Sequence, residues 1–148
     1  MPETTYLQTI MADWQAAAGD VATALAAAGV EPLLAWYTGE PVPLPTGMAP
    51  LAWWAWRAEA TRDISEALDS QTEEIKVIFV VAVGGASPAE LMAAEAVYVP
   101  TIKAALESRT WDFQPSYLGG DRMLDPGGLV SWTAMVWSIT IDREIGGV

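Results

Sequence analysis

The sequence contains no cysteine and no histidine among its 148 residues. Without cysteine the chain can form no disulfide and offers no thiol nucleophile, and without histidine it has no imidazole to act as a general base. The same two absences exclude zinc sites built from Cys and His ligands and every Ser-His-Asp or Cys-His catalytic set. We therefore expect no catalytic residue, no metal site and no cofactor, so the question of function moves from chemistry to assembly.

Positive charge is scarce as well. Seven Lys and Arg residues stand against 19 Asp and Glu, which gives a formal net charge of −12. A chain with so few cations is a poor binder of phosphate backbones, although it could surround DNA without gripping it. The simpler interpretation of the acidic balance is solubility.

The sequence also lacks a targeting segment and a long apolar run. Its first basic residue is Arg57, so the positive region that begins a signal peptide is absent. The longest apolar run, Val77–Ala86, is far shorter than the roughly 18–20 residues that span a bilayer. We expect no membrane association, and a soluble protein that stays or is assembled inside a cell.

Few of the remaining polar residues form a pattern with chemical meaning. Gly84-Gly85 precedes a helix start, but the Lys and the Ser or Thr of a phosphate-binding P-loop are missing. We favour a tight strand-to-helix turn there over a phosphate site at the helix N-terminus. The carboxylate pairs Glu73-Glu74 and Asp121 with Asp125 match neither a glycosidase pair nor a calcium loop, and we interpret them as solvated surface charge.

Two segments have helical periodicity. Residues 4–28 carry one apolar stripe, with Gly29 as a natural stop and Gly19-Asp20 as a potential interruption. Ser87-Pro88-Ala89-Glu90 has the composition of a capping box with proline in the first turn, which predicts a helix to about Arg109 that Pro100 should kink. The predicted buried stripes are Leu7, Ile10, Met11, Trp14, Ala18, Val21 and Leu25 in the first helix, and Leu91, Ala94, Tyr98, Ile102, Ala105 and Leu106 in the second.

Four segments are typical of strands, namely residues 33–38, 51–62, 73–83 and 129–142. The third is apolar on both faces and should be central in its sheet. In the fourth, the apolar face changes partway along the strand. Either a bulge near Ala134–Val136 or a strand covered on different sides at its two ends explains this change.

The connecting segments complete the predicted fold. Residues 39–50 contain four prolines and two glycines and should form an extended loop or an interaction arm. Residues 63–72 are expected to form a helical turn or a hairpin loop, and residues 114–128 a hairpin loop with Gly119-Gly120 as a two-residue turn and Asp125–Gly128 as a second turn. The pattern predicts a single α+β domain over residues 1–148, with a mixed, mostly antiparallel sheet of about four to five strands and two main helices packed on it.

Eight tryptophans are unusual for a chain of this size. A core position suits Trp14, Trp111 and at least one of Trp53, Trp54 and Trp56. Helices on one face of a sheet leave the large apolar residues of the other face in need of a second cover, which is either the 39–50 arm or a neighbouring subunit. Self-association is the favoured interpretation, with a monomeric tryptophan-rich core and a ligand-stacking surface as alternatives.

The order of these elements resembles the tail terminator and tail-completion proteins of long-tailed bacteriophages. The resemblance is carried by the N-terminal helix, the proline-rich loop, the strands containing WWAW and IKVIFVVAV, the Ser-Pro-Ala-Glu helix, the turn-rich hairpin and the closing strand LVSWTAMVWSITID. It implies an α+β structural virion protein that forms a hexameric ring at the head-proximal end of the tail tube. Such a ring ends tube polymerisation and offers a surface to the head–tail connector, while DNA passes through its lumen without specific binding.

Under this interpretation three regions should make contacts. We expect the arm and the tryptophan-rich strand to pack on the adjacent subunit, through Pro43, Pro45, Trp53, Trp54, Trp56 and Arg57. The 114–127 hairpin should contact the tail tube or the head side, through Asp121, Arg122 and Met123. Arg57 and Arg122 are rare cations, so each is a candidate inter-subunit ion-pair partner, with an intramolecular pair or a solvated charge as the alternative.

Two other functions remain open from the sequence. One is a different head–tail connector or tail-tube component, which would form open tubes rather than closed rings. The other is a small ligand-binding or enzymatic α+β domain with a tryptophan-lined pocket. The resemblance places the protein in the virion, at the head-proximal end of the tail, after assembly in the host cytoplasm.

Overall fold

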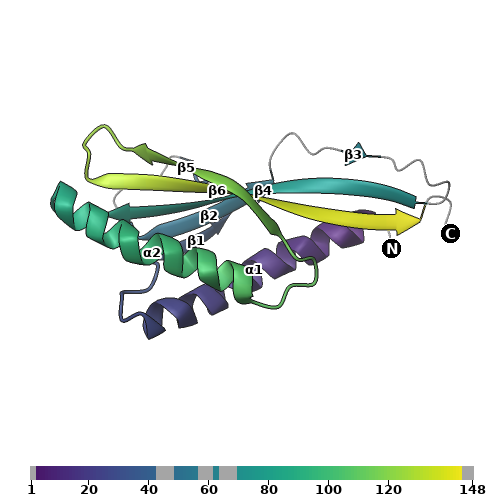
Figure 1. The fold of residues 1–148 in the computed structure, drawn as a ribbon, viewed down its shortest axis with the longest axis horizontal. Helices are drawn as coiled ribbons and strands as arrows, with labels where there is room; N and C mark the ends of the chain where they lie inside the picture. The colour runs from purple at the N-terminus through teal and green to yellow at the C-terminus, as the bar shows by residue number, and fades with distance from the viewer. Residues whose placement is uncertain (1–2, 43–48, 57–61, 64–69, 145–148) are drawn as a thin grey trace.

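The structure is a computed structural model that describes the backbone of residues 3–42, 49–56, 62–63 and 70–144. Two helices and six strands follow one another along this part of the chain (Figure 1). They are α1 (Glu3–Ala27), β1 (Ala35–Thr38), β2 (Leu51–Trp56), β3 (Arg62–Asp63), β4 (Ser70–Gly84), α2 (Pro88–Ser108), β5 (Ser116–Leu124) and β6 (Val130–Glu144).

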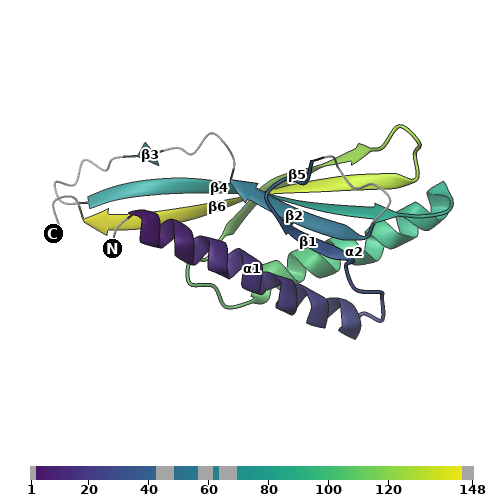
Figure 2. The same cartoon turned by 180° about the vertical axis from the view of Figure 1, so that it is seen from behind.

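One mixed sheet organises these elements, with the strand order β1-β2-β4-β6-β5. β1 runs parallel to β2, and all the other pairs are antiparallel, which confirms the predicted α+β class. The two-residue strand β3 pairs antiparallel with β4 outside this path. Residues 64–69, which make up most of the predicted helical turn or hairpin loop, lie outside the described residues. Both helices pack on the same face of the sheet, as Figures 1 and 2 show from opposite sides.

The central strands β4 and β6 are 15 residues long and pair along their whole length. β2 covers only the Val77–Ala82 part of β4, and β5 covers only the Ser131–Ser138 part of β6. The remaining ends of the two long strands extend beyond α2 and lie beside the first turns of α1 (Figures 1 and 2). The sheet is therefore wide at one end and narrows to a ribbon at the other.

The capping signals of α2 act as expected. The N–H of Glu90 donates to Oγ of Ser87 at 3.2 Å, and Oε2 of Glu90 accepts from the N–H of Ala86 at 2.9 Å. A Cβ at Gly85 would lie 2.5 Å from the amide nitrogen of Leu91, so only glycine fits the turn between β4 and α2. This confirms the tight strand-to-helix turn.

The apolar stripes of both helices also lie where the sequence placed them. α1 runs without a break through Gly19 and Asp20, and Gly29 follows it with φ of +75°. Of the predicted residues, Ile10, Trp14, Val21 and Leu25 are buried in α1, and Leu91, Tyr98, Ile102, Ala105 and Leu106 in α2. Ala17 is buried in place of the predicted Ala18, which is partly buried like Leu7 and Met11.

Trp14 lies at the centre of the main core, between α1 and the sheet. Its ring centroid is 4.8 Å from that of Trp111, 5.9 Å from Phe79, 6.1 Å from Trp54 and 6.3 Å from Trp137. These partners come from β2, β4, β6 and the segment after α2, so one side chain of α1 contacts three strands of the sheet and the end of the α2 region. The core positions predicted for Trp14 and Trp111 are confirmed.

The change of apolar face in β6 has a simple cause. The register between β4 and β6 is constant from Ser70↔Glu144 to Gly84↔Val130, so no bulge interrupts this pair. Trp132 is buried on the face without helices, whereas Trp137, Ile139 and Ile141 are buried beneath the helices. The strand is thus covered on different sides at its two ends, which was the second of the two explanations.

The prediction of a two-residue turn at Gly119-Gly120 is wrong. Both glycines lie inside β5, next to a bulge between Tyr117 and Gly119. Gly119 has φ of +147°, and a Cβ at Gly120 would lie 2.7 Å from the carbonyl oxygen of Ala134. The glycines permit a bulge and a close approach to β6 rather than a reversal. The chain reverses at Asp125–Gly128, where the N–H of Gly128 donates to the carbonyl of Asp125 at 2.8 Å.

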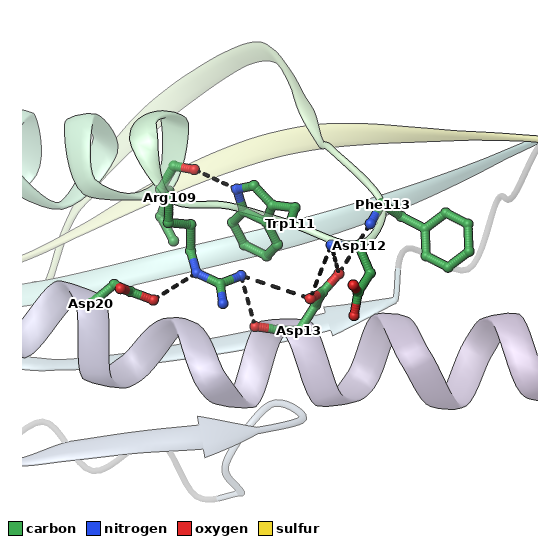
Figure 3. A network of polar contacts seen from close by, with 7 residues as sticks. Asp13, Asp20, Arg109, Trp111, Asp112 and Phe113 are labelled. Atoms are coloured by element: carbon green, nitrogen blue, oxygen red, sulfur yellow. Dashed lines mark hydrogen bonds and ion pairs between the residues drawn. The ribbon is translucent and has the colours of Figure 1, made fainter.

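A network of polar contacts fastens the end of α2 to the middle of α1 (Figure 3). Oδ2 of the buried Asp13 accepts hydrogen bonds from the N–H groups of Asp112 at 3.0 Å and Phe113 at 3.2 Å. Arg109, just after α2, donates from Nε to Asp20 at 2.8 Å and from Nη1 to the carbonyl of Asp13 at 3.2 Å. Its guanidinium also lies over the ring of Trp111, 4.2 Å from the centroid. The network holds the segment that leads into β5.

We predict that Asp13→Ala lowers the free energy of unfolding by about 1–3 kcal/mol, because the partly buried hydrogen bonds from the N–H groups of Asp112 and Phe113 lose their acceptor. Asp20→Ala is the matched control, because Asp20 is exposed and its removal should cost less than about 1 kcal/mol. Urea titrations followed by circular dichroism measure both changes. Equal losses in the two variants would contradict a structural role for the Asp13 carboxylate.

Candidate assembly surface

The face of the sheet opposite the helices carries a second apolar cluster. Its buried members are Leu51, Trp53, Val80, Ala82 and Trp132, from β2, β4 and β6. The same face becomes polar toward the ribbon end, where Glu74, Lys76, Ser138 and Thr140 occupy the alternate positions of β4 and β6. The apolar part of this helix-free face is therefore limited to the wide end of the sheet.

Two open hollows adjoin on the helix-free face. One has a volume of about 380 Å³ and is bordered by Trp53, Trp132 and Met123. The other, of about 450 Å³, is bordered by Leu118 and Asp121. Ile78 and Ala134 line both hollows, so together they form one shallow groove that crosses the sheet from β2 to β5. Hereafter we call this feature the apolar groove.

Strand β5 and the turn after it form the most apolar exposed edge of the described chain. Nine large apolar side chains are exposed in the described residues, and five of them lie here: Tyr117, Leu118, Met123, Leu124 and Leu129. Edge strands that present apolar side chains tend to pair or pack with another chain unless something covers them. The contact role of the hairpin region stays a prediction.

The three residues proposed for tube or head contact point to different sides of β5. Asp121 and Met123 are opposite Ala134 and Trp132 and lie on the helix-free face. Arg122 is opposite Thr133 and faces α2, where it makes two hydrogen bonds to Glu95, one of them 2.7 Å from Nη2 to Oε1. The structure thus gives Arg122 an intramolecular partner, the alternative considered from the sequence.

The Arg122–Glu95 ion pair borders a third hollow, between α2 and β5. This hollow has a volume of about 490 Å³ and is otherwise lined mainly by apolar groups such as Met92, Val99 and Pro100. The hydrogen bond from Arg122 lowers the pKa of Glu95, and the nearby positive charge adds to this effect against the opposing effect of partial burial. The same hydrogen bond raises the pKa of Arg122. The pair ties the edge strand to α2.

We predict that the stabilisation from this pair depends on pH. Because the pKa of Glu95 is lowered on folding, its contribution is present above the ordinary glutamate pKa and disappears as the pH falls through the lowered value. The difference in urea midpoint between the wild type and Arg122→Ala should therefore shrink on acidification. In a Glu95→Gln protein, the change in urea midpoint caused by Arg122→Ala should no longer depend on the titration of Glu95. If that change is independent of pH both with and without Glu95, the ion pair is not the source of the stabilisation.

The three tryptophans of β2 differ in location. Trp53 is 7% exposed in the cluster of the helix-free face, whereas Trp54 is 1% exposed in the main core beneath α1. Trp56 is 37% exposed at the end of the strand, with its ring centroid 5.5 Å from that of Trp54. As a correction, Trp54 is enclosed by its own chain and its ring offers no surface to a second subunit. Arg57, Pro43 and Pro45 lie outside the described residues.

Ile78, Ala134 and Glu95 belong to this surface but were not singled out from the sequence. The sequence pattern gave a partial indication of Ile78 and Ala134, because each lies in a strand whose two faces are both apolar. No sequence pattern indicated Glu95, because its pairing with Arg122 depends on how α2 crosses the sheet.

Within the part of the chain that the structure describes, no three Asp or Glu side chains gather into a group that could hold a metal ion. No helix in the same part combines the length and apolar character needed to cross a membrane.

Comparison with known proteins finds similarity in structure. No family model matches the chain, and no curated protein matches it. A solved structure described as the virion of a native gene transfer agent (GTA) particle contains a chain that is 10% identical to this one, with a TM-score of 0.60. The match covers 93% of this chain and 97% of that chain. This chain is therefore similar in fold to a component of that particle over nearly the full length of both.

Proposed function

We propose that this protein is a structural subunit of a phage-like virion. The observation that carries the proposal is the fold shared with a chain of a GTA virion over almost the whole of both chains. The composition supports the same conclusion, because a chain without cysteine and histidine lacks the usual catalytic and metal-binding side chains. We accordingly propose a protein without enzymatic activity.

Within the virion, we propose a tail terminator role: a ring, hexameric by resemblance, at the head-proximal end of the tail tube. A closed ring needs two different surfaces on each subunit, which meet at a heterologous interface. Two apolar surfaces support this, namely the apolar groove on the helix-free face and the exposed edge formed by β5 and its turn, which adjoin at Leu118 and Met123. Trp53 and Trp56 border the first, and Met123 lies between the two.

The remaining partners follow from the same proposal. The β5 edge, with Asp121, Arg122 and Met123, would contact the tail tube protein or the head–tail connector protein. The net charge of −12 supports a lumen that lets DNA pass without binding it, because like charges repel the phosphate backbone. The protein would be located in the virion, at the head-proximal end of the tail, after assembly in the host cytoplasm.

The test is the mass in solution, measured by light scattering after size-exclusion chromatography at several concentrations and two salt levels. We expect a species near six subunits, and ring-shaped particles in negative-stain images. Open tubes in the images would favour a tail-tube component instead. A protein that stays monomeric, even when purified tail tubes are added, would contradict the proposal.

One observation favours a second candidate function, that of a ligand-binding domain. The hollow bordered by Trp53 and Trp132 has the size of a small-molecule site. If the protein is a ligand-binding domain, a panel of metabolites should change its tryptophan fluorescence, and an Ala134→Trp variant, which fills the hollow, should abolish that change.

A further inference from the structure

The apolar groove has the properties of a site for an extended peptide. It crosses strands β2, β4, β6 and β5, and its two hollows meet at Ile78 and Ala134. Aromatic side chains from β2 and β6, Trp53 and Trp132, border one end. Grooves lined with aromatic residues are the usual sites for proline-rich segments in the polyproline II conformation.

The chain itself contains a matching segment. Residues 41–45 read Pro-Val-Pro-Leu-Pro, so every second residue lacks a backbone N–H. Each residue that precedes a proline is also held in an extended conformation. Such a segment can cross an apolar surface with few unsatisfied donors, and it loses little conformational entropy when it binds.

The side chain of Val42 is the most exposed large apolar group in the described residues, at 90%. Glu40, two residues earlier, still borders the apolar groove. The chain therefore leaves its own groove near Glu40 and places Val42 in solvent. An apolar side chain presented in this way is available to a neighbouring molecule.

We propose that Val42 and the prolines flanking it dock into the apolar groove of a second copy of this chain. The docked segment lies extended across β4 and β6, with Val42 over Ala134 and Ile78. This inference rests on the proposed function, because ring assembly supplies the neighbouring copy. It specifies the heterologous contact: one subunit donates the segment and the next one provides the groove.

The native chain contains no cysteine, so in a disulfide test the introduced cysteines are the only thiols. Two single-cysteine variants are made, Val42→Cys and Ala134→Cys, and circular dichroism confirms that each is folded. One of the two proteins carries a size tag, so that the heterodimer differs in mass from either homodimer. The two are mixed under mild oxidation and separated on a non-reducing gel. A disulfide forms only when the two Cα atoms approach to within roughly 4.4–6.8 Å, so a heterodimer reports the docked geometry. Because the two cysteines are on different molecules, the heterodimer reports contact between copies.

The matched control pairs Val42→Cys with Ala16→Cys, which is exposed on α1 and on the other face of the sheet. We expect at least roughly tenfold more heterodimer with Ala134→Cys than with this control, because docking raises the local thiol concentration. Heterodimer at the control level would overturn the proposal. So would a Val42→Cys/Ala134→Cys double variant in which the disulfide forms only within one chain.

A peptide measurement provides an independent readout. A synthetic peptide of residues 39–49 should shift the tryptophan emission of the protein and reduce the heterodimer yield, whereas the same peptide with Pro41, Pro43 and Pro45 replaced by alanine should do neither. Failure of the inference and failure of the proposed function give different results. If rings form but the disulfide does not, only the docking mode is refuted. If the disulfide forms in dimers or open tubes and no rings are seen, only the terminator role is refuted.

Discussion

Trp14→Ala is expected to lower the free energy of unfolding by about 3–5 kcal/mol, the usual cost of removing a large aromatic side chain from a core. The ring of Trp14 is fully buried and contacts Trp54, Phe79 and Trp137 from three strands of the sheet, and Trp111 from the segment after α2. Because α1 lies against the sheet through this ring, the remaining side chains cannot collapse to fill the cavity without moving the helix. Since domains are stable by only about 5–15 kcal/mol, the loss is a large part of the total.

The measurement is a urea titration followed by far-UV circular dichroism. Trp56→Ala is the matched control, because it removes the same side chain from a half-exposed position at the end of β2 and should cost clearly less. An equal or larger loss for Trp56→Ala would mean that the core is not organised around Trp14.

The second large effect concerns assembly. Ala134→Arg is expected to abolish the proposed oligomer while leaving the subunit folded. Ala134 lines both hollows of the apolar groove, on the face that the helices leave open, so an arginine there has room in the isolated subunit. In an assembled ring the same guanidinium would be buried without a partner, at a cost of several kcal/mol, which corresponds to a loss of affinity of at least about 100-fold.

Thr140→Arg is the control for this variant. Thr140 is exposed in the same strand and on the same face, but it lies at the polar ribbon end. Light scattering should find Ala134→Arg monomeric and Thr140→Arg assembled like the wild type. If both variants assemble, the apolar groove is not the subunit contact, and if both are monomeric, the contact extends over the whole face.

Local signals predicted the helices well. The Ser87 cap, Pro88 and Glu90 define the start of α2 through contacts within a few residues, so the neighbouring sequence contains all the information. The apolar periodicity of α1 and the two-faced apolar pattern of β4 are local in the same sense, and from them the α+β class follows.

Features that depend on a partner strand could not be read in the same way. Gly119-Gly120 is as suitable for a tight turn as for a bulge, and only the close approach of Ala134 in β6 decides between them. Strand alternation separates Trp53 from Trp54 but does not say which face the helices cover. The Arg122–Glu95 pair depends on the crossing of α2 over the sheet. The part of the candidate site that sequence patterns missed is the part created by tertiary contacts.

The full-length pairing of β4 with β6 has a consequence for folding. The two strands that carry most of the sheet are separated in the chain by all of α2 and β5, and Ser70 pairs with Glu144. Contacts so distant in sequence form late and slow the overall rate. On the ribosome, β4 emerges well before its partner and exposes two apolar faces and an unpaired edge in the meantime. Expression yield should therefore depend on chaperone capacity and growth temperature more strongly than the equilibrium stability of the finished fold would indicate.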